Sequence, residues 1–413
     1  MKQHIDHLAI LGGPPAFDQP LHVGRPNLGD RDRLMTRIGE LLDRRWLTND
    51  GPLVQEFERR LVAFTGARHC IATCNGTVAL ELAARAVVNH GEEAEATTAD
   101  GEVIVPAFTF VATAHALRWL GLRPVFCDIE PVSHTIDPDR VEALITPQTR
   151  AIVGVHVWGR PCHIDRLQKI ADRHGLTLLF DAAHALGCTW RGRPIGGFGT
   201  AEIFSFHATK FVNAFEGGAI ATNDDALAAR LRLMRNFGFA GYDQVVSLGV
   251  NGKMSEVSAA MGLTSLESCD EFIAVNRRNH EQYQHELSGV AGLGMLAYES
   301  SEQSNYQYVV VEVDAPAAGL SRDGLVEVLW AENVLARRYF FPGCHRMEPY
   351  VSAGAPPHLP VTDLVASRVL LLPTGTTIGT REIAEICEII RLAVSNSEQV
   401  QRTLRERPPA IPG

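Results

Sequence analysis

The sequence has no run of basic residues, no long apolar run and few cysteines. Its 413 residues include 38 Lys and Arg against 48 Asp and Glu, which gives a formal net charge of −10. It therefore lacks the clustered positive charge that neutralises nucleic-acid phosphates. No apolar run reaches the roughly 20 residues of a membrane-spanning helix, and residues 1–14 lack the basic and apolar regions of a signal peptide. We expect a cytoplasmic protein that binds neither nucleic acid nor membrane.

The 8 cysteines are scattered from Cys70 to Cys387 and none forms a Cys-x-x-Cys pair. Most lie in apolar surroundings, so we expect buried free thiols, as is usual in a reducing cytoplasm. No set of metal-ligating residues is assigned.

The length and composition indicate an α/β enzyme. Hydrophobic residues make up 46% of the chain and there are 36 glycines, which is typical of a globular α/β protein with many turns. Short apolar runs alternate with amphipathic stretches, and this alternation predicts a mostly parallel, doubly wound sheet. We expect an extended N-terminal arm (1–30), a large domain (31–270), a smaller C-terminal α+β domain (271–405) and a disordered tail (406–413). The polar stretch 89–100 is expected to be an exposed, mobile loop.

The predicted strands of the large domain are 69–72, 103–105, 124–128, 151–157, 176–180, 201–206 and 219–222. Its predicted helices are 31–44, 52–64, 78–88, 112–119, 139–145, 164–174 and 224–234. Beyond a long helical stretch from 255 to 287, we expect strands at 306–313, 334–341 and 369–372 and helices at 322–332 and 381–394.

The strand predicted at 201–206 ends in a stretch with chemically useful residues. Ser205, Thr209 and Lys210 follow the apolar run, and the pair Gly217–Gly218 lets backbone approach a ligand. Lys210 is flanked by Phe206 and other apolar residues, so partial desolvation should favour its neutral, nucleophilic amine. On local grounds alone, Lys210 could equally be a surface lysine beside a turn.

A second polar residue makes a catalytic interpretation stronger. Asp181 directly follows the strand predicted at 176–180, and ligands of open α/β sheets bind at such strand ends. A lysine that forms a Schiff base and an acid that keeps a pyridine nitrogen protonated are the two groups that pyridoxal phosphate needs. Upstream, Thr73–Thr77 links a strand to a helix through a glycine, an arrangement that can hold a phosphate on free N–H groups. An ordinary strand-to-helix turn would have the same pattern.

Six motifs in order make the chain recognisable. They are Trp46–Pro52, Asn75–Leu80, Pro106–Thr113, Asp181–Ala185, Ser205–Lys210 and Gly249–Met254. From about Trp46 to Leu392 the chain resembles the DegT/DnrJ/EryC1/StrS family of sugar aminotransferases. The resemblance implies fold type I, pyridoxal 5′-phosphate as cofactor and a homodimer with active sites at the interface. It also implies Lys210 and Asp181 as catalytic residues that both contact the cofactor.

The resemblance assigns further cofactor contacts. Phe110 would stack on the ring, and His184 stands where the family has Gln or His near the ring O3′. Gly76, Thr77 and Ser205 would hold the phosphate.

One phosphate contact would come from the neighbouring subunit. Asn251 lies in a glycine-rich loop, 238–252, which crosses to that subunit in the family. Lys253 replaces the family's usual arginine; because an ammonium is not a two-pronged donor, Lys253 is given no contact.

The substrate is suggested by a local match. Glu332–His345 looks like the corresponding segment of C4 aminotransferases that act on dTDP-4-keto-6-deoxyglucose in natural-product deoxysugar biosynthesis. We expect a nucleotide-sugar substrate and L-glutamate as amino donor. Arg337 or Arg338 would then bind the diphosphate, although a salt bridge on a strand is the commoner role of such arginines.

Three alternatives stay open. A deoxysugar 3-dehydratase shares the fold but has histidine in place of the lysine, so Lys210 argues against it. An aminotransferase for a cyclitol such as scyllo-inosose, or an aminohydroxybenzoate synthase, shares the Asp-Ala-Ala-His pattern. A regulatory protein that binds the cofactor without turnover is disfavoured by the intact pair of Asp181 and Lys210.

Overall fold

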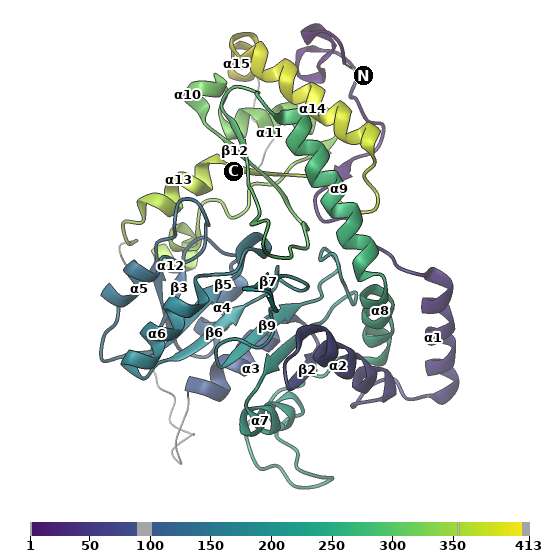
Figure 1. Ribbon diagram of the computed structural model, residues 1–413, viewed down its shortest axis with the longest axis vertical. Helices are drawn as coiled ribbons and strands as arrows, with labels where there is room; N and C mark the ends of the chain where they lie inside the picture. The colour runs from purple at the N-terminus through teal and green to yellow at the C-terminus, as the bar shows by residue number, and fades with distance from the viewer. Residues whose placement is uncertain (1, 89–100, 353, 355, 407–413) are drawn as a thin grey trace.

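The computed structural model describes residues 2–88, 101–352, 354 and 356–406. In this part of the chain a seven-stranded sheet forms the core of a large α/β domain, and a three-stranded sheet lies in a smaller domain above it (Figure 1). No helix among the described residues is long and apolar enough to span a bilayer.

The large sheet has the strand order β2–β10–β9–β6–β5–β3–β4. Its strands are β2 (His69–Thr73), β3 (Glu102–Pro106), β4 (Arg123–Cys127), β5 (Thr149–Val155), β6 (Thr177–Asp181), β9 (Ala201–Ser205) and β10 (Gly218–Thr222). Every pair is parallel except those of β10, which runs antiparallel to β2 and β9. The predicted fold class, a mostly parallel doubly wound sheet, is confirmed.

Helices cover both faces of this sheet. One face packs against α2 (Pro52–Thr65), α6 (Ile164–His174) and α8 (Glu256–Glu267), and the other against α3 (Gly76–Val88), α4 (Ala112–Trp119) and α7 (Asp225–Arg235). The shorter α5 (Pro138–Ala143) lies beside α6, and α1 (Arg31–Arg44) packs on α8 at the edge of the body (Figure 1). A small hairpin joins β7 (Thr189–Trp190) to β8 (Arg193–Pro194).

The helix starts follow local sequence signals. The Asp30 carboxylate accepts a hydrogen bond from the backbone N–H of Arg33, and Pro52 occupies the first turn of α2. The predicted starts of these two helices are confirmed.

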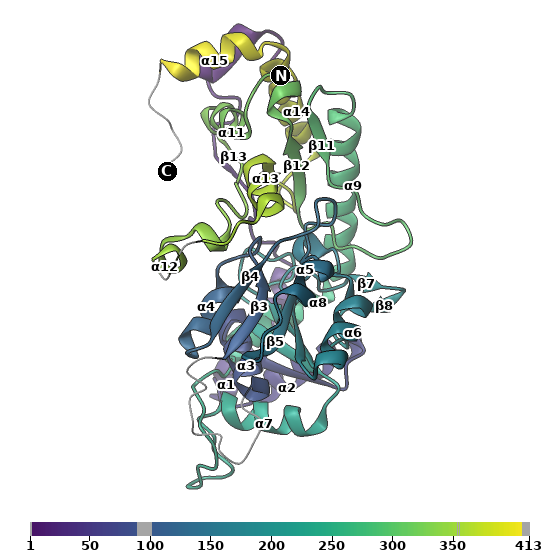
Figure 2. The same cartoon turned by 90° about the vertical axis from the view of Figure 1, so that its left-hand side faces the viewer.

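The small domain is built on an antiparallel sheet of β11 (Leu293–Met295), β12 (Val309–Val313) and β14 (Val369–Leu372). The long helix α9 (Cys269–Leu287) leads up from the large domain, as Figures 1 and 2 show. The other helices are α10 (Ala315–Ala318), α11 (Arg322–Ala331), α12 (Glu348–Val351), α13 (Pro360–Arg368), α14 (Thr380–Ser395) and α15 (Ser397–Arg405). A separate parallel pair joins β1 (Leu21–His22) to β13 (Val334–Leu335).

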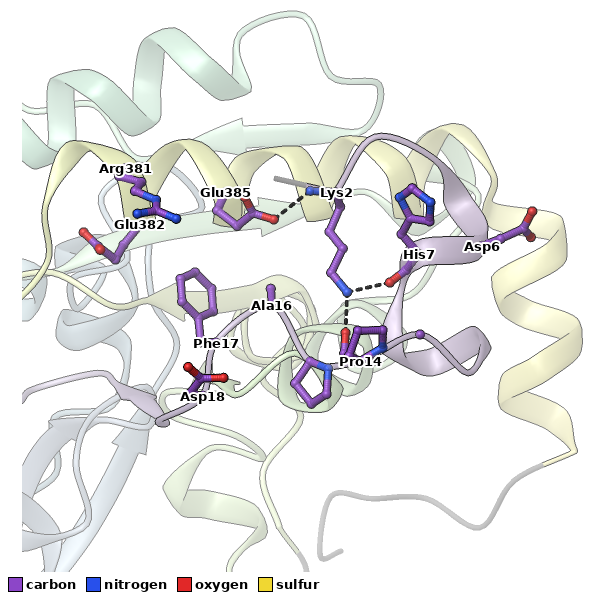
Figure 3. Close-up of a pocket in the computed structure, with 12 residues that line it drawn as sticks. Lys2, Asp6, His7, Pro14, Ala16, Phe17, Asp18, Arg381, Glu382 and Glu385 are labelled. Carbon is purple, nitrogen blue, oxygen red and sulfur yellow. Dashed lines mark hydrogen bonds between the residues drawn. The ribbon is translucent and has the colours of Figure 1, made fainter.

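Residues 2–30 differ from the predicted extended arm. They contain two 3-10 turns, Ile5–His7 and Ala9–Leu11, and Leu8 and Ile10 are buried in the core of the small domain. Figure 3 shows the Lys2 side chain pointing at the carbonyls of His7 and Pro14 beside a cavity of about 580 Å³. The prolines and glycines of this segment indicated an extended arm. The apolar residues between them are instead buried against the small domain.

The strand predicted at 334–341 is also shorter than expected. It ends at Leu335, and Arg337 makes only an isolated bridge to Leu371. The chain then turns back, with the N–H of Gly343 bonded to the carbonyl of Phe340. Apolar and aromatic residues made this segment look like a strand, but they line a cavity instead.

The remaining predictions concern cysteines, a loop and the tail. All eight cysteines are free, and all except Cys74 are buried, as expected of structural thiols. The predicted loop 89–100 and tail residues 407–413 lie outside the described residues.

Candidate active site

A cavity of about 510 Å³ lies where several sheet strands end and the small domain closes over them. Seven of the eight predicted site residues line it: Gly76, Thr77, Phe110, Asp181, His184, Ser205 and Lys210. The small domain adds Tyr308, Arg337, Tyr339 and Phe340. Residues distant in sequence meet here because parallel strands end at the same edge of a sheet.

Lys210 lies just beyond the end of β9, in a turn closed by a hydrogen bond from its N–H to the carbonyl of His207. Its Nζ lies 3.4 Å from the hydroxyl of Tyr308. Burial lowers the pKa of Lys210 to about 8, although the negative charge of Asp181 opposes this effect. Far more of its amine is therefore neutral near pH 7 than for an ordinary lysine.

Asp181 is the last residue of β6, and its side chain is buried. The Thr113 hydroxyl donates to Oδ2 at 2.8 Å, and the backbone N–H of Ala183 donates to Oδ1 at 3.1 Å. Thr113 in turn lies 3.0 Å from the hydroxyl of Thr109. These contacts fix the orientation of a carboxylate that lines the cavity.

His184 is held in one tautomer. The backbone N–H of Trp158 lies 3.2 Å from Nδ1, and a backbone N–H can only donate, so Nδ1 is the acceptor and Nε2 carries the hydrogen. Burial, with a smaller effect from the nearby Lys210 charge, lowers the pKa of His184 well below its usual value. The imidazole is therefore a neutral donor beside the cavity.

The N-terminus of α3 forms another part of the cavity wall. The Asn75 side chain caps the N–H of Val78 at 2.8 Å, whereas the first N–H groups of a helix have no intrahelical partner. A Cβ on Gly76 would come within 3.0 Å of Ser205 Cβ, and one on Gly218 would lie 2.5 Å from the Asn75 carbonyl. Both glycines thus allow the close packing that forms this backbone pocket, which suits an anion.

The two phenylalanines of the 106–113 motif have different environments. Phe110 is 59% exposed and lines the cavity, whereas Phe108 is fully buried and packs edge-on against Trp158 and Phe340. A large ring exposed on a cavity wall is available to a flat ligand. Stacking of Phe110 on the cofactor therefore stays a prediction, and the buried Phe108 is not available for it.

Asn251 is the one predicted site residue that the structure does not bring to this cavity. It is exposed and forms an isolated bridge with Asn236. The neighbouring Lys253 donates to the Asn236 side chain at 2.9 Å, and its ammonium lies over the ring of Phe237.

Sequence reasoning missed several residues of the site. Tyr308, the residue just before β12 of the small domain, contacts Lys210, and no local sequence pattern indicated this contact. Thr113 lies in the 106–113 motif, but nothing in that motif indicated its contact with Asp181. Of the two arginines considered, Arg337 lines the cavity and has no carboxylate partner in the described part of the chain, whereas Arg338 pairs with Asp323 at 3.4 Å.

Comparisons with known proteins agree on one family. A model of the DegT/DnrJ/EryC1/StrS aminotransferase family matches residues 30–391. The chain is 35% identical to dTDP-4-amino-4,6-dideoxy-D-glucose transaminase of Escherichia coli over 379 residues, which cover 90% of this chain and 98% of the relative. It is 33% identical to GDP-perosamine synthase of Caulobacter vibrioides over 347 residues, or 83% of this chain and 89% of the relative. A crystal structure of DesI "in the presence of its TDP-sugar product" aligns with a TM-score of 0.91 and 52% identity, covering 97% of this chain and 100% of that one.

Proposed function

The chain belongs to the DegT/DnrJ/EryC1/StrS aminotransferase family, and from that premise we propose a specific reaction. The protein uses pyridoxal 5′-phosphate to transfer an amino group from L-glutamate to C4 of dTDP-4-keto-6-deoxy-D-glucose. The product is the 4-amino-4,6-dideoxy sugar, and the role is in natural-product deoxysugar biosynthesis. One observation carries the proposal: an amine with a lowered pKa, an oriented carboxylate and a helix N-terminus line the same cavity.

The lining of the cavity fits this cofactor. Backbone N–H groups at Gly76 and Thr77, with the Ser205 hydroxyl, match a phosphate. The Asp181 carboxylate matches a protonated pyridine nitrogen, and the Nε2–H of His184 matches the ring oxygen O3′. When bound, pyridoxal phosphate supplies a reactive aldehyde and a ring that accepts electrons from the substrate carbon.

Each chemical role then follows from the protonation of a side chain. Lys210 would hold the cofactor through its Nζ, and the lowered pKa also suits the same Nζ to carry a proton to and from the reacting carbon. The negative carboxylate of Asp181 would keep the pyridine nitrogen protonated, and the hydrogen bonds from Thr113 and Ala183 fix its position for that contact. His184 donates from Nε2 because Nδ1 already accepts a hydrogen bond.

The nucleotide part of the substrate has a candidate partner in Arg337. Its side chain is exposed, lies 5.5 Å over the ring of Tyr339 and lines the cavity. A guanidinium without a carboxylate partner is suited to a diphosphate. Arg338 is engaged with Asp323 and is given no such role.

We propose that the active unit is a homodimer. The segment around Asn251 exposes apolar side chains, which include Phe237, Tyr242, Val245 and Leu248. Such a surface is typical of a protein–protein contact. Asn251 would then reach the phosphate in the partner's cavity.

Mixing two inactive variants tests this arrangement. In a heterodimer of K210A and N251A chains, one cavity carries both defects and the other carries neither. Activity should therefore return when the two variants are unfolded and refolded together, while each alone stays inactive. Refolded mixtures that remain inactive despite heterodimer formation would exclude the shared site.

The substrate is tested by a panel of acceptors with L-glutamate as donor. We expect release of 2-oxoglutarate with dTDP-4-keto-6-deoxy-D-glucose, and less with a GDP-linked 4-keto sugar, scyllo-inosose or an aminohydroxybenzoate precursor. A K210A variant should lose both the reaction and the visible absorbance of the bound cofactor. Turnover of scyllo-inosose in preference to every nucleotide sugar would replace the proposed function by a cyclitol aminotransferase, and no turnover with any acceptor would favour a regulatory protein.

A further inference from the structure

A chain of contacts runs from the small domain to His184 through a strained tryptophan. Trp158 follows β5, is fully buried and has φ = +62°, a conformation that bulky residues rarely adopt. Strain of this kind persists only where the surroundings hold it, and it is concentrated at functional sites. The hydrogen bonds of Trp158 show which residues stabilise this conformation and which residue it positions.

Both the backbone and the indole of Trp158 make hydrogen bonds. Its backbone N–H donates to His184 Nδ1 at 3.2 Å, and its carbonyl accepts from the hydroxyl of Tyr298 at 3.2 Å. Its indole Nε1–H donates to Nδ1 of His134, also at 3.2 Å. The indole ring lies nearly parallel to the His184 ring, with 19° between the planes.

His134 continues the chain of contacts. It is fully buried, and because its Nδ1 accepts from the indole, its Nε2 carries the hydrogen in the neutral ring. That Nε2 lies 3.3 Å from Oε1 of Glu312, a residue of β12 in the small domain, but it makes no hydrogen bond, so this last contact is one of proximity alone. The order is therefore Glu312, His134, Trp158 and His184, from the small domain to the cavity.

We propose that Trp158 and His134 are positioning residues: the bond between indole and imidazole holds the Trp158 backbone so that its N–H keeps His184 in the Nε2–H tautomer. This inference rests on the proposed function only for its consequence, which is that His184 offers a hydrogen to the cofactor ring. In the described part of the chain, the residues that line the cavity include neither Trp158 nor His134. Both would therefore act through His184.

The alternative is that Trp158 merely fills the core. A core residue would tolerate phenylalanine at some cost in stability, and the tautomer of His184 would not change. The two interpretations differ in a measurable property of one imidazole ring, and that property can be read without substrate.

The test uses W158F, H134F and the double variant, loaded with cofactor. W158F removes the indole donor and keeps the ring and backbone, while H134F removes the acceptor and keeps an aromatic ring. The matched control is W190F, because the buried Nε1 of Trp190 has no hydrogen-bond partner in the structure. Thermal unfolding of each variant shows that it is folded.

The main readout is ¹⁵N NMR of histidine-labelled protein, with the His184 signal identified by its loss in H184Q. Wild type and W190F should show one His184 tautomer, with hydrogen on Nε2, and W158F and H134F should show a mixture. The visible absorbance maximum of the bound cofactor should shift in the same two variants. Their kcat should fall roughly tenfold to a hundredfold, with KM nearly unchanged. The double variant should behave like either single variant, because the two substitutions remove the same hydrogen bond.

An unchanged His184 signal in both W158F and H134F would overturn the inference, whether or not activity falls. A mixed tautomer in these variants would support it even if the wild type acted on none of the proposed sugars. A wild type that is inactive on every sugar would reject the proposed substrate without affecting the positioning role. Failure of the proposed function and failure of this inference are therefore distinguishable.

Discussion

The lowered pKa of Lys210 makes a prediction about stability. Burial brings this pKa from 10.5 to about 8 in the folded, cofactor-free protein. A difference of that size corresponds to about 3 kcal/mol of destabilisation while the amine is charged. Replacing Lys210 by methionine removes this cost but also removes the contact with the Tyr308 hydroxyl, worth about 1 kcal/mol. K210M should therefore be more stable than wild type by about 2 kcal/mol at pH 7.

The difference in stability between K210M and wild type should depend on pH. Below about pH 8 the amine is protonated in both folded and unfolded chains, so the cost is complete. Between about 8 and 10.5 the folded protein releases its proton first, so the free energy of unfolding of wild type rises with pH relative to K210M. Above 10.5 both states are neutral and the advantage of K210M disappears.

Urea unfolding of the cofactor-free proteins at pH 7 and pH 10.5, at one fixed protein concentration, measures this difference. K169M is the matched control, because Lys169 is exposed on α6 and its replacement should change stability by less than about 0.5 kcal/mol at either pH. A wild type that is at least as stable as K210M at pH 7, or a gap that does not change with pH, would refute the reasoning.

Three further changes test other parts of the site. T113V removes the hydroxyl that donates to buried Asp181 and should destabilise the protein by about 1.5–3 kcal/mol in urea unfolding, whereas T113S should not. G218A places a Cβ 2.5 Å from the Asn75 carbonyl, so it should push β10 away from the α3 N-terminus and cost about 1–3 kcal/mol; absorbance titration should show weaker binding of pyridoxal phosphate. R337Q should raise KM for the nucleotide sugar about tenfold or more, with KM for glutamate unchanged, because a charge-assisted contact is lost only with the sugar substrate; equal changes in both constants would argue against a diphosphate contact.

Much of the fold could be predicted because its signals are local. Asp30 and Pro52 mark helix starts through contacts within one turn, and the apolar run before Asp181 is long enough for one buried strand. The segment after Leu335 was predicted wrongly because a run of apolar and aromatic residues suits both a strand and a cavity wall. The arm at residues 1–30 was misjudged because the burial of Leu8 depends on a domain formed by residues far along the chain.

For the site, the sequence by itself determined the chemical groups and their family: a lysine, an acid, a glycine turn and an aromatic ring, each at the end of a recognisable element. Such information is encoded within a few residues, and order along the chain preserves it. Only the tertiary structure decided the partners, because Tyr308 lies 98 residues from Lys210. Only the packing, likewise, shows that Arg337 lines the cavity while Arg338 pairs with Asp323. The strained Trp158 and its bond to His134 also arise only when two distant segments are packed together, which no periodicity in the sequence records.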